Sequence, residues 1–252
     1  MRTDELVVDV SQDWVLACDV QQRFMQGLDC ISSSVDYSAR CRQVRALGGD
    51  CYDFMPLADN RLALVVGDAS GKGLAAALMM ANVQSSLRTA ALFTGNDLAA
   101  LLKVVNRQAY ASSLADRYAT VFYGVFDAAT RMLRYVNAGH NPPVVVRRNG
   151  SFGWLETGGA PIGMFPDSAY EESTVQLDPG DLVVAYTDGV IEGANQIGEE
   201  WGVQGLLTAT AACGRQCAED AENLVRSIFD CLDDFSRGHQ TDDATLAVLR
   251  VV

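Results

Sequence analysis

The sequence predicts an α+β fold in which two antiparallel β-sheets pack face to face as a sandwich, with a pair of helices on each outer face. Most of the predicted strands come as neighbouring hairpins, and hairpins place their strands antiparallel. The predicted helices come in two pairs, one in the first half of the chain and one near its end, so each pair can cover one sheet. No repeat, low-complexity tract or linker follows residue 30. We therefore expect an N-terminal helical segment at 1–30 and one domain at 31–252.

The N-terminal segment is expected to form a helix over residues 5–29, because apolar residues recur there in steps near three and four. The stripe consists of Val10, Trp14, Ala17, Phe24 and Leu28, and Gln21 interrupts it. Such a stripe fits a helix packed on the flank of the domain. It also fits a helix that makes a homodimer or carries a signal from an upstream regulatory domain, and both alternatives stay open at this stage.

Three strands are predicted next. Residues 33–43 alternate apolar and polar side chains, which is the pattern of a half-buried strand. Residues 50–57 and 61–67 are expected to pair as a hairpin over the turn at 58–60.

Two helices follow this hairpin. The first is expected over residues 71–92, with Ser70 as its N-cap, and the second is expected to begin after an N-cap at Asn96. The inward face of the first helix is predicted to consist of Leu74, Leu78, Ala81 and Leu87. That of the second is predicted to consist of Leu98, Leu101, Leu102, Val105 and Ala109.

The second half of the chain is predicted to be a meander of strands that ends in a helix pair. The expected hairpins join 118–126 to 132–138, 144–148 to 151–155 over Asn149-Gly150, and 172–177 to 182–187 over the turn at 178–181. The helices are expected at 199–212, broken near Gly202 and Gly205, and at 219–235. A last strand follows Asp242.

Composition excludes several classes of protein. With 49% hydrophobic and 20% charged residues, the 252-residue chain can bury a large core. Its net charge of −13 argues against a nucleic-acid or anionic-membrane partner. It has neither the apolar run of a membrane span nor a secretory signal at its N-terminus. Seven cysteines without a CxxC pair and only two histidines disfavour a zinc site and are typical of reduced thiols in a cytoplasmic protein.

Acidic residues stand beside strongly apolar strands at four places. They are Asp50 after a Gly-Gly pair, Asp68 and Asp188 at the ends of predicted strands, and the pair Asp242-Asp243 before the last strand. If these side chains converge, two charges about 4 Å apart repel each other by ~4 kcal/mol near a protein surface, so the cluster needs cations. Because every candidate ligand is an oxygen, hard ions such as Mg²⁺ or Mn²⁺ fit, and zinc or copper do not.

These acidic residues belong to an ordered set of motifs. The set is GGDxxD at 48–53, VGDASGKG at 66–73, YATVF at 118–122, NAGHNPP at 137–143, YTDGV at 186–190 and DDAT at 242–245. Together the motifs resemble the PPM-type metal-dependent serine/threonine phosphatases, and most closely their SpoIIE/RsbU branch. The resemblance covers residues 20–252.

The resemblance implies a site with two Mn²⁺ or Mg²⁺ ions that activate a water molecule for attack on phosphoserine or phosphothreonine. Asp68 would contact both ions, and the backbone carbonyl of Ala69 would be a further ligand. Asp188 and Asp242 would complete one ion, and Asp50 would lie in or next to the ligand shell. The implied substrate is a phosphorylated STAS-domain anti-sigma-factor antagonist in a partner-switching pathway.

Several alternatives remain at the level of the sequence. Asp243 could replace Asp242 as the ligand, and Asp53 could be either a solvent-exposed turn residue or a supporting one. His140 fits a hydrogen bond that braces its loop better than a general acid, and Lys72 fits a solvated lysine better than a substrate contact. The alternative functions are a catalytically weak module that binds a phosphoprotein and a hydrolase of small phosphoesters.

Overall fold

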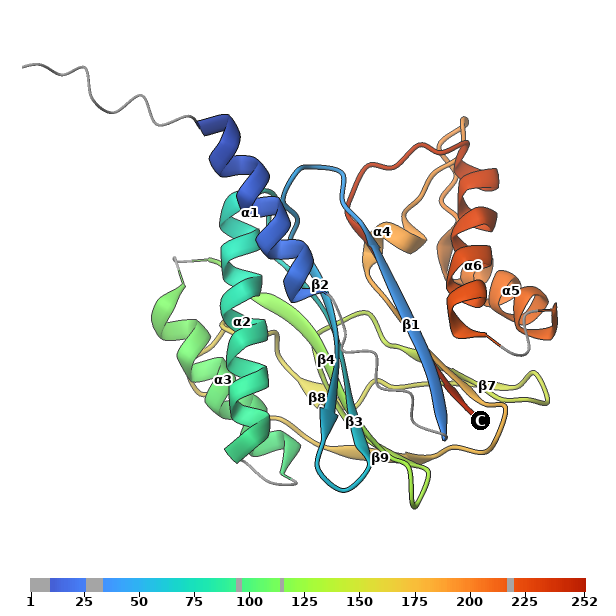
Figure 1. The fold of residues 1–252 in the computed structure, drawn as a ribbon, viewed down its shortest axis with the longest axis horizontal. Helices are drawn as coiled ribbons and strands as arrows, with labels where there is room; N and C mark the ends of the chain where they lie inside the picture. The colour runs from blue at the N-terminus through green and yellow to red at the C-terminus, as the bar shows by residue number, and fades with distance from the viewer. Residues whose placement is uncertain (1–9, 26–33, 94–96, 114–115, 217–219) are drawn as a thin grey trace, which may run out of the picture.

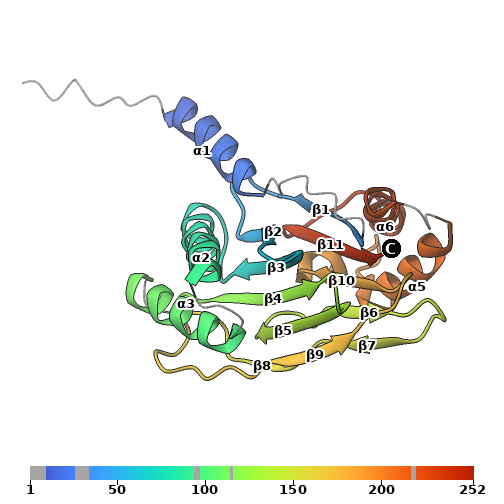
Figure 2. The same ribbon diagram turned by 60° about the horizontal axis from the view of Figure 1, so that its bottom comes forward.

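The computed structural model describes residues 10–25, 34–93, 97–113, 116–216 and 220–252. Two stacked sheets lie between two helix pairs, and the N-terminal helix α1 (Val10–Phe24) extends along one side (Figures 1 and 2). The predicted α+β sandwich is therefore confirmed. Within the described residues, no helix combines the length and the apolar character that a bilayer-spanning helix needs.

One sheet has five strands in the order β1-β11-β10-β6-β7. The other has the order β2-β3-β4-β5-β8, with β9 paired to β5 beside this path. The strands of the first sheet are β1 (Val35–Arg42), β6 (Val144–Val146), β7 (Phe152–Trp154), β10 (Leu182–Tyr186) and β11 (Ala244–Val251). Those of the second are β2 (Asp50–Leu57), β3 (Arg61–Ala69), β4 (Ala119–Asp127), β5 (Met132–Ala138), β8 (Gly158–Gly159) and β9 (Ser173–Gln176).

The helices divide between the two outer faces. They are α2 (Leu74–Phe93), α3 (Leu98–Ser112), α4 (Asp188–Ile191), α5 (Gly202–Gln216) and α6 (Ala221–Ser236). Helices α2 and α3 pack on the sheet that contains β2 to β5, and α5 and α6 pack on the other sheet. A third apolar layer, which includes Leu64, Phe122 and Val183, lies between the two sheets. Burial of the apolar side chains in these three layers holds the two sheets and the helix pairs together.

The strand pairing differs from the prediction in two places. Strand β9 pairs with β5, whereas β10 pairs with β11 and β6 in the other sheet, so the expected hairpin at 172–187 was wrong. The turn at 178–181 carries the chain from one sheet to the other, and Asp181 holds it through its contacts with Arg147 and with the backbone N–H of Asp178. The short strand β8 runs parallel to β5, so the sheets are not wholly antiparallel.

Helix α2 was predicted with the wrong start and partly the wrong face. It begins at Leu74, because Gly71 and Gly73 adopt φ angles of +91° and +77° that end the preceding loop. Ser70 is not an N-cap, since its backbone N–H and its hydroxyl oxygen bond to the backbone of Tyr118. Leu74 and Leu78 are exposed. The buried face consists instead of Ala76, Ala77, Met80, Val83, Gln84, Leu87 and Ala90.

The other helices follow the sequence more closely. The predicted buried stripe of α3 is confirmed at all five positions. Its N-cap is Asp97, which accepts a hydrogen bond from the N–H of Ala100, and Asn96 lies outside the described residues. Helix α5 is continuous from Gly202, so the expected break at Gly205 was wrong. A side chain at Gly205 would collide with the ring of Trp201, which explains the glycine there.

In helix α1 the predicted stripe was wrong. Trp14 and Phe24 are 39% and 41% exposed, whereas Gln21, the residue that interrupts the stripe, is buried. The side-chain amide of Gln21 forms hydrogen bonds with the backbone of Gly48, in the loop between β1 and β2. Polar contacts therefore dock this part of α1 on the domain. Leu28 lies outside the described residues. The helix leaves apolar side chains exposed, and the expected homodimer contact through it stays a prediction.

Candidate metal centre

The four acidic points meet where one end of each sheet comes together. Strands β2 and β3 pair so that Asp50 stands opposite Asp68. In the other sheet, β10 pairs with β11, and Asp188 follows the first strand while Asp242 precedes the second. A side chain at Gly189 would collide with the carbonyl oxygen of Asp243, so these two loops touch. The order of the strands therefore explains how residues far apart in the sequence become neighbours.

Asp50 is the most deeply buried of these carboxylates, with 2% of its surface exposed. Its Oδ2 accepts hydrogen bonds of 2.7 Å from the hydroxyls of both Thr187 and Thr245. Burial and the neighbouring charge of Asp68 raise the pKa of Asp50 well above its usual value. The two threonines fix the carboxyl group in place, and a cation bound nearby would favour its ionised form.

Asp68 lies at the centre of the group. Burial, followed by the charges of Asp188 and Asp242, raises the pKa of Asp68 to about 7. Burial and the charge of Asp242 also raise the pKa of Asp188. These carboxylates destabilise one another's ionised forms because they are close together and partly removed from water.

The donor set fits hard divalent cations. The available ligands are carboxylate oxygens and the backbone carbonyl of Ala69, which lies against Gly49. Of the nearby thiols, Cys51 is buried and Cys41 is half-buried, and removal from water raises the pKa of each well above its usual value, so neither supplies a thiolate. Among the described residues, no group of three or more histidine, cysteine, aspartate or glutamate side chains is arranged so that it could hold a metal ion as it stands. The proposed ion binding would therefore need these carboxylates to move closer together.

The structure separates the roles of Asp242 and Asp243. Both oxygens of Asp243 are occupied, since Oδ1 accepts from the N–H of Val44 at 2.8 Å and Oδ2 from the N–H of Gly49 at 3.1 Å. Asp242 Oδ2 instead contacts Nζ of Lys72 at 2.5 Å. Asp243 therefore fixes the backbone around the site, and Asp242 is the residue of the pair that is free to exchange its partner for a metal ion. Lys72 is exposed, as expected of a solvated lysine, and it also forms an ion pair with Asp242 that the sequence did not predict.

The Gly-Gly turn before Asp50 is held from two sides. Gln21 of α1 donates to the carbonyl of Gly48 at 2.7 Å and accepts from its N–H at 3.2 Å. The carbonyl of Gly49 accepts from the N–H of Ala69 at 3.2 Å. A side chain at Gly48 would collide with Asp243, so only glycine fits. Helix α1 thus contacts the loop that positions two of the acidic residues, a link that the sequence pattern did not reveal.

Asp53, the second aspartate of the GGDxxD motif, is a buried structural residue. It is fully shielded from solvent, and Arg88 of α2 pairs with both of its oxygens at 2.5 and 2.8 Å. Gln84 donates a third hydrogen bond at 3.1 Å. Of the two alternatives that the sequence left open for Asp53, a solvent or turn position and a supporting role, these contacts favour the supporting one. A polar pair four residues apart on a helix, Gln84 and Arg88, was the signal that could have located its partners.

His140 braces the loop between β5 and β6. It is 5% exposed, and its Nδ1 lies 2.9 Å from the hydroxyl of Thr120. Asn137 accepts from its backbone N–H and donates to its backbone carbonyl. Burial lowers the pKa of His140 to about 4, so the ring is neutral at pH 7. These contacts are those of the bracing role that the sequence favoured.

Replacing His140 with Asn should reduce the loss of stability in acid. The unfolded chain binds a proton near the ordinary histidine pKa of 6.5, whereas the folded protein resists it until about pH 4. The stability from the neutral ring is complete above the unfolded pKa and is lost as the pH falls toward 4. Urea unfolding between pH 7 and 4 should show the wild type losing on the order of 3 kcal/mol more than H140N. The control H239N, at an exposed histidine, should follow the wild type; parallel wild-type and H140N profiles would refute the buried neutral ring.

The architecture defines the class of protein. The RsbU and RsbW domains of Rv1364c from Mycobacterium tuberculosis superpose with a TM-score of 0.72 at 28% identity, over 86% of this chain and 60% of that one. The catalytic domain of the serine/threonine phosphatase PstP, in complex with two manganese ions, superposes with a TM-score of 0.63 at 18% identity, over 87% and 99% of the chains. The fold is that of the PPM-type phosphatases. The chain belongs to the SpoIIE family, since the model described as Stage II sporulation protein E matches residues 58–252.

Relatives of known name are similar over much of the chain. Protein IcfG of Synechocystis is 32% identical over 197 residues, which cover 67% of this chain and 31% of IcfG. Phosphoserine phosphatase RsbU of Bacillus subtilis is 26% identical over 245 residues, which cover 96% of this chain and 71% of RsbU. The chain thus spans about a third of one relative and most of the other. The predicted family is confirmed, and the roles of individual residues stay predictions.

Proposed function

We propose that this chain is a Mn²⁺- or Mg²⁺-dependent phosphatase for phosphoserine or phosphothreonine in proteins. The observation that carries the proposal is the meeting of Asp50, Asp68, Asp188 and Asp242 at one end of the sandwich, where burial, followed by the charges of Asp188 and Asp242, raises the pKa of Asp68 to about 7. Similarity to a phosphoserine phosphatase supports the reaction. A cluster of carboxylates with these pKa shifts is typical of a functional site.

Each residue of the site has a distinct proposed role in binding the ions or the substrate. Asp68, the carbonyl of Ala69, Asp188 and Asp242 would hold two ions, and Asp50 would orient the group through Thr187 and Thr245. The ions, when bound, would acidify a water molecule and neutralise the phosphoryl oxygens. Lys72 would give up Asp242 and keep a positive charge beside the substrate. A net charge of −13 makes such local cations necessary for a phosphorylated ligand.

We propose a phosphorylated STAS-domain protein as the substrate and an upstream regulatory segment that acts through α1. The similarity to RsbU, and to a structure that joins RsbU and RsbW domains, supports the partner-switching setting. The contact of Gln21 with the Gly-Gly turn supplies a physical route from α1 to the acidic residues. Gly48 contacts Gln21 of α1, and Gly49 contacts Ala69, one of the residues proposed to bind the ions. The Gly-Gly turn therefore joins the helix to the proposed ion site.

Phosphate release from p-nitrophenyl phosphate and from a serine-phosphorylated STAS-domain protein tests the function, each with Mn²⁺ and with a chelator. We expect turnover of both substrates with Mn²⁺ and of neither with chelator. Turnover of the small ester alone would favour the small-phosphoester hydrolase. Binding of the phosphoprotein without turnover of either substrate would favour the binding module and contradict the proposal.

A further inference from the structure

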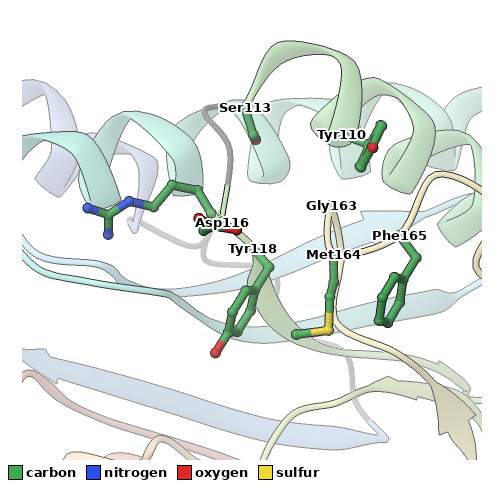
Figure 3. Close-up of a pocket in the computed structure, with 8 residues that line it drawn as sticks. Tyr110, Ser113, Asp116, Tyr118, Gly163, Met164 and Phe165 are labelled. Atoms are coloured by element: carbon green, nitrogen blue, oxygen red, sulfur yellow. The ribbon is translucent and has the colours of Figure 1, made fainter.

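A cavity of about 590 Å³ opens between the C-terminal end of α3 and the loop that precedes β9. Figure 3 shows Tyr110 on the helix, with Met164 and Phe165 on the facing loop. Arg117 and Tyr118, which lead into β4, complete one side. The volume falls within the range of small-molecule sites, ~300–1,000 Å³, and is large enough for several peptide residues. None of the roles assigned above uses this cavity.

The cavity adjoins the acidic site through Ser70, two residues after Asp68. Arg117 donates from Nη1 to the carbonyl of Ser70 at 2.7 Å, and the N–H of Tyr118 donates to the Ser70 hydroxyl at 3.0 Å. A side chain at Gly71 would collide with the guanidinium of Arg117, so this group lies directly on the loop. The next residue, Lys72, contacts Asp242. The cavity, Arg117, the loop and the acidic residues therefore form a continuous surface.

Arg117 is the cationic residue that lines the cavity, and its guanidinium has N–H donors available for a ligand. It is half buried, and among the described residues its hydrogen bond goes to the Ser70 carbonyl and no carboxylate forms an ion pair with it. A guanidinium carries five N–H donors in a planar fork that suits a phosphate. The remaining donors of Arg117 therefore complement a phosphorylated ligand at the edge of the cavity nearest the acidic site.

The apolar wall of the cavity is exposed yet fixed in place. Tyr110 and Phe165 are 47% and 56% exposed. The loop that carries Phe165 is tied to α3 by the buried Asn106, which donates to the carbonyl of Phe165 at 2.8 Å and accepts from the N–H of Gly163 at 2.8 Å. Ile162 pairs with Ala119 through two backbone hydrogen bonds. An apolar surface that is rigid before binding loses little entropy when a ligand covers it.

We propose that this cavity binds the polypeptide that flanks the phosphoserine, with an apolar side chain packed between Tyr110 and Phe165 and Arg117 bound to the phosphate. The inference rests on the proposed function and adds its substrate specificity. Asp116 at the rim disfavours an acidic residue in the same position. The cavity thus selects phosphoserine segments with an apolar neighbour over small esters and over acidic segments.

The test uses synthetic peptides with one phosphoserine in an alanine-glycine background and a single Phe placed at each of the three positions before and after it. For the wild type with Mn²⁺, one Phe position should raise kcat/KM about tenfold over the peptide without Phe, the factor expected for one buried aromatic side chain. Phe165→Ala and Tyr110→Ala should each bring this ratio close to one. The control Phe152→Ala, at an equally exposed phenylalanine on β7, should keep the wild-type ratio.

Arg117→Ala should raise KM for every phosphopeptide at least several-fold, while Arg117→Lys should restore part of the loss, because the ammonium keeps the charge without the fork. Thermal unfolding of each variant checks that the fold is intact. If the wild type hydrolyses the peptides with equal kcat/KM at every Phe position, or Phe165→Ala keeps the selectivity, the cavity proposal is overturned and the proposed function stands. If the wild type hydrolyses neither the peptides nor p-nitrophenyl phosphate, both are overturned.

Discussion

Asp68→Asn should abolish Mn²⁺-dependent hydrolysis of p-nitrophenyl phosphate. Its kcat should fall by well over ~100-fold, because changing a residue that merely supports a metal ligand already costs about 10–100-fold. The amide keeps the shape of the side chain but loses the charge that would bind both ions. Steady-state kinetics at saturating Mn²⁺, with Mn²⁺ affinity measured by calorimetry, give the readout.

The same variant should not be less stable than the wild type when metal is removed. Burial, followed by repulsion from Asp188 and Asp242, raises the pKa of Asp68, and the neutral amide removes both the cost of burying a charge and the repulsion. The unfolding temperature in chelator should therefore stay equal or rise, whereas the increase that Mn²⁺ causes in the wild type should disappear. Asp59→Asn, an exposed aspartate in the turn between β2 and β3, is the matched control and should behave as the wild type. Near-normal turnover of Asp68→Asn would remove Asp68 from the site.

Arg88→Ala should destabilise the fold by about 3 kcal/mol, since it leaves the buried carboxylate of Asp53 without its cation. Gln84 still donates one hydrogen bond to Asp53, which keeps the loss near the lower end of the range for broken buried pairs. Urea unfolding in chelator measures the change without a contribution from bound metal.

Two further variants separate the buried charge from the loss of packing. Arg107→Ala removes an arginine whose pair with Asp167 is long, at 3.9 Å, and exposed, and it should cost less than ~1 kcal/mol. Adding Asp53→Asn to Arg88→Ala should recover part of the stability, because the amide carries no charge to bury. Equal effects of Arg88→Ala and Arg107→Ala would show that Asp53 does not depend on its ion pair.

The succession of strands along the chain and the acidic residues beside them could be predicted, because both follow from local sequence patterns. Apolar alternation and turn residues located most strands, and each acidic residue stands at the end or the start of one. The sheet to which a strand belongs was harder to predict. β9 and β10 look like a hairpin because the turn at 178–181 has the composition of one. The partner of each strand is set by burial in the apolar layers, which local composition does not report.

Polar residues with long-range partners were the other source of error. Gln21 occupies a position of the predicted apolar stripe, where a polar side chain looks like a mere interruption, yet its amide docks α1 on Gly48. Ser70 has the composition of an N-cap but bonds to Tyr118. Leu74 and Leu78 are exposed, because the face of α2 that packs on the sheet carries Ala76, Ala77 and Met80 in this part of the helix. In each case a tertiary contact overrides a valid local preference.

At the candidate site, the acidic residues could be located from the sequence, but the hydrogen-bond partners that separate one from another could be seen only in the structure. The choice between Asp242 and Asp243 depends on which one faces the Gly-Gly turn, and only the positions of Val44 and Gly49 reveal that. The role of Asp53 depends on Arg88, a residue 35 positions away. Hydrogen-bond partners of this kind follow from the packing of α2 on β2 and not from any motif.

The most direct measurement is the anomalous scattering of manganese in crystals grown or soaked with Mn²⁺. We predict two peaks beside the carboxylate of Asp68, at least one of them also bound by Asp188 and Asp242, with Lys72 displaced from Asp242. Crystals of Asp68→Asn under the same conditions should show neither peak at full occupancy. Wild-type crystals with manganese elsewhere and none between Asp68 and Asp188 would contradict the proposal that these acidic side chains form a metal centre.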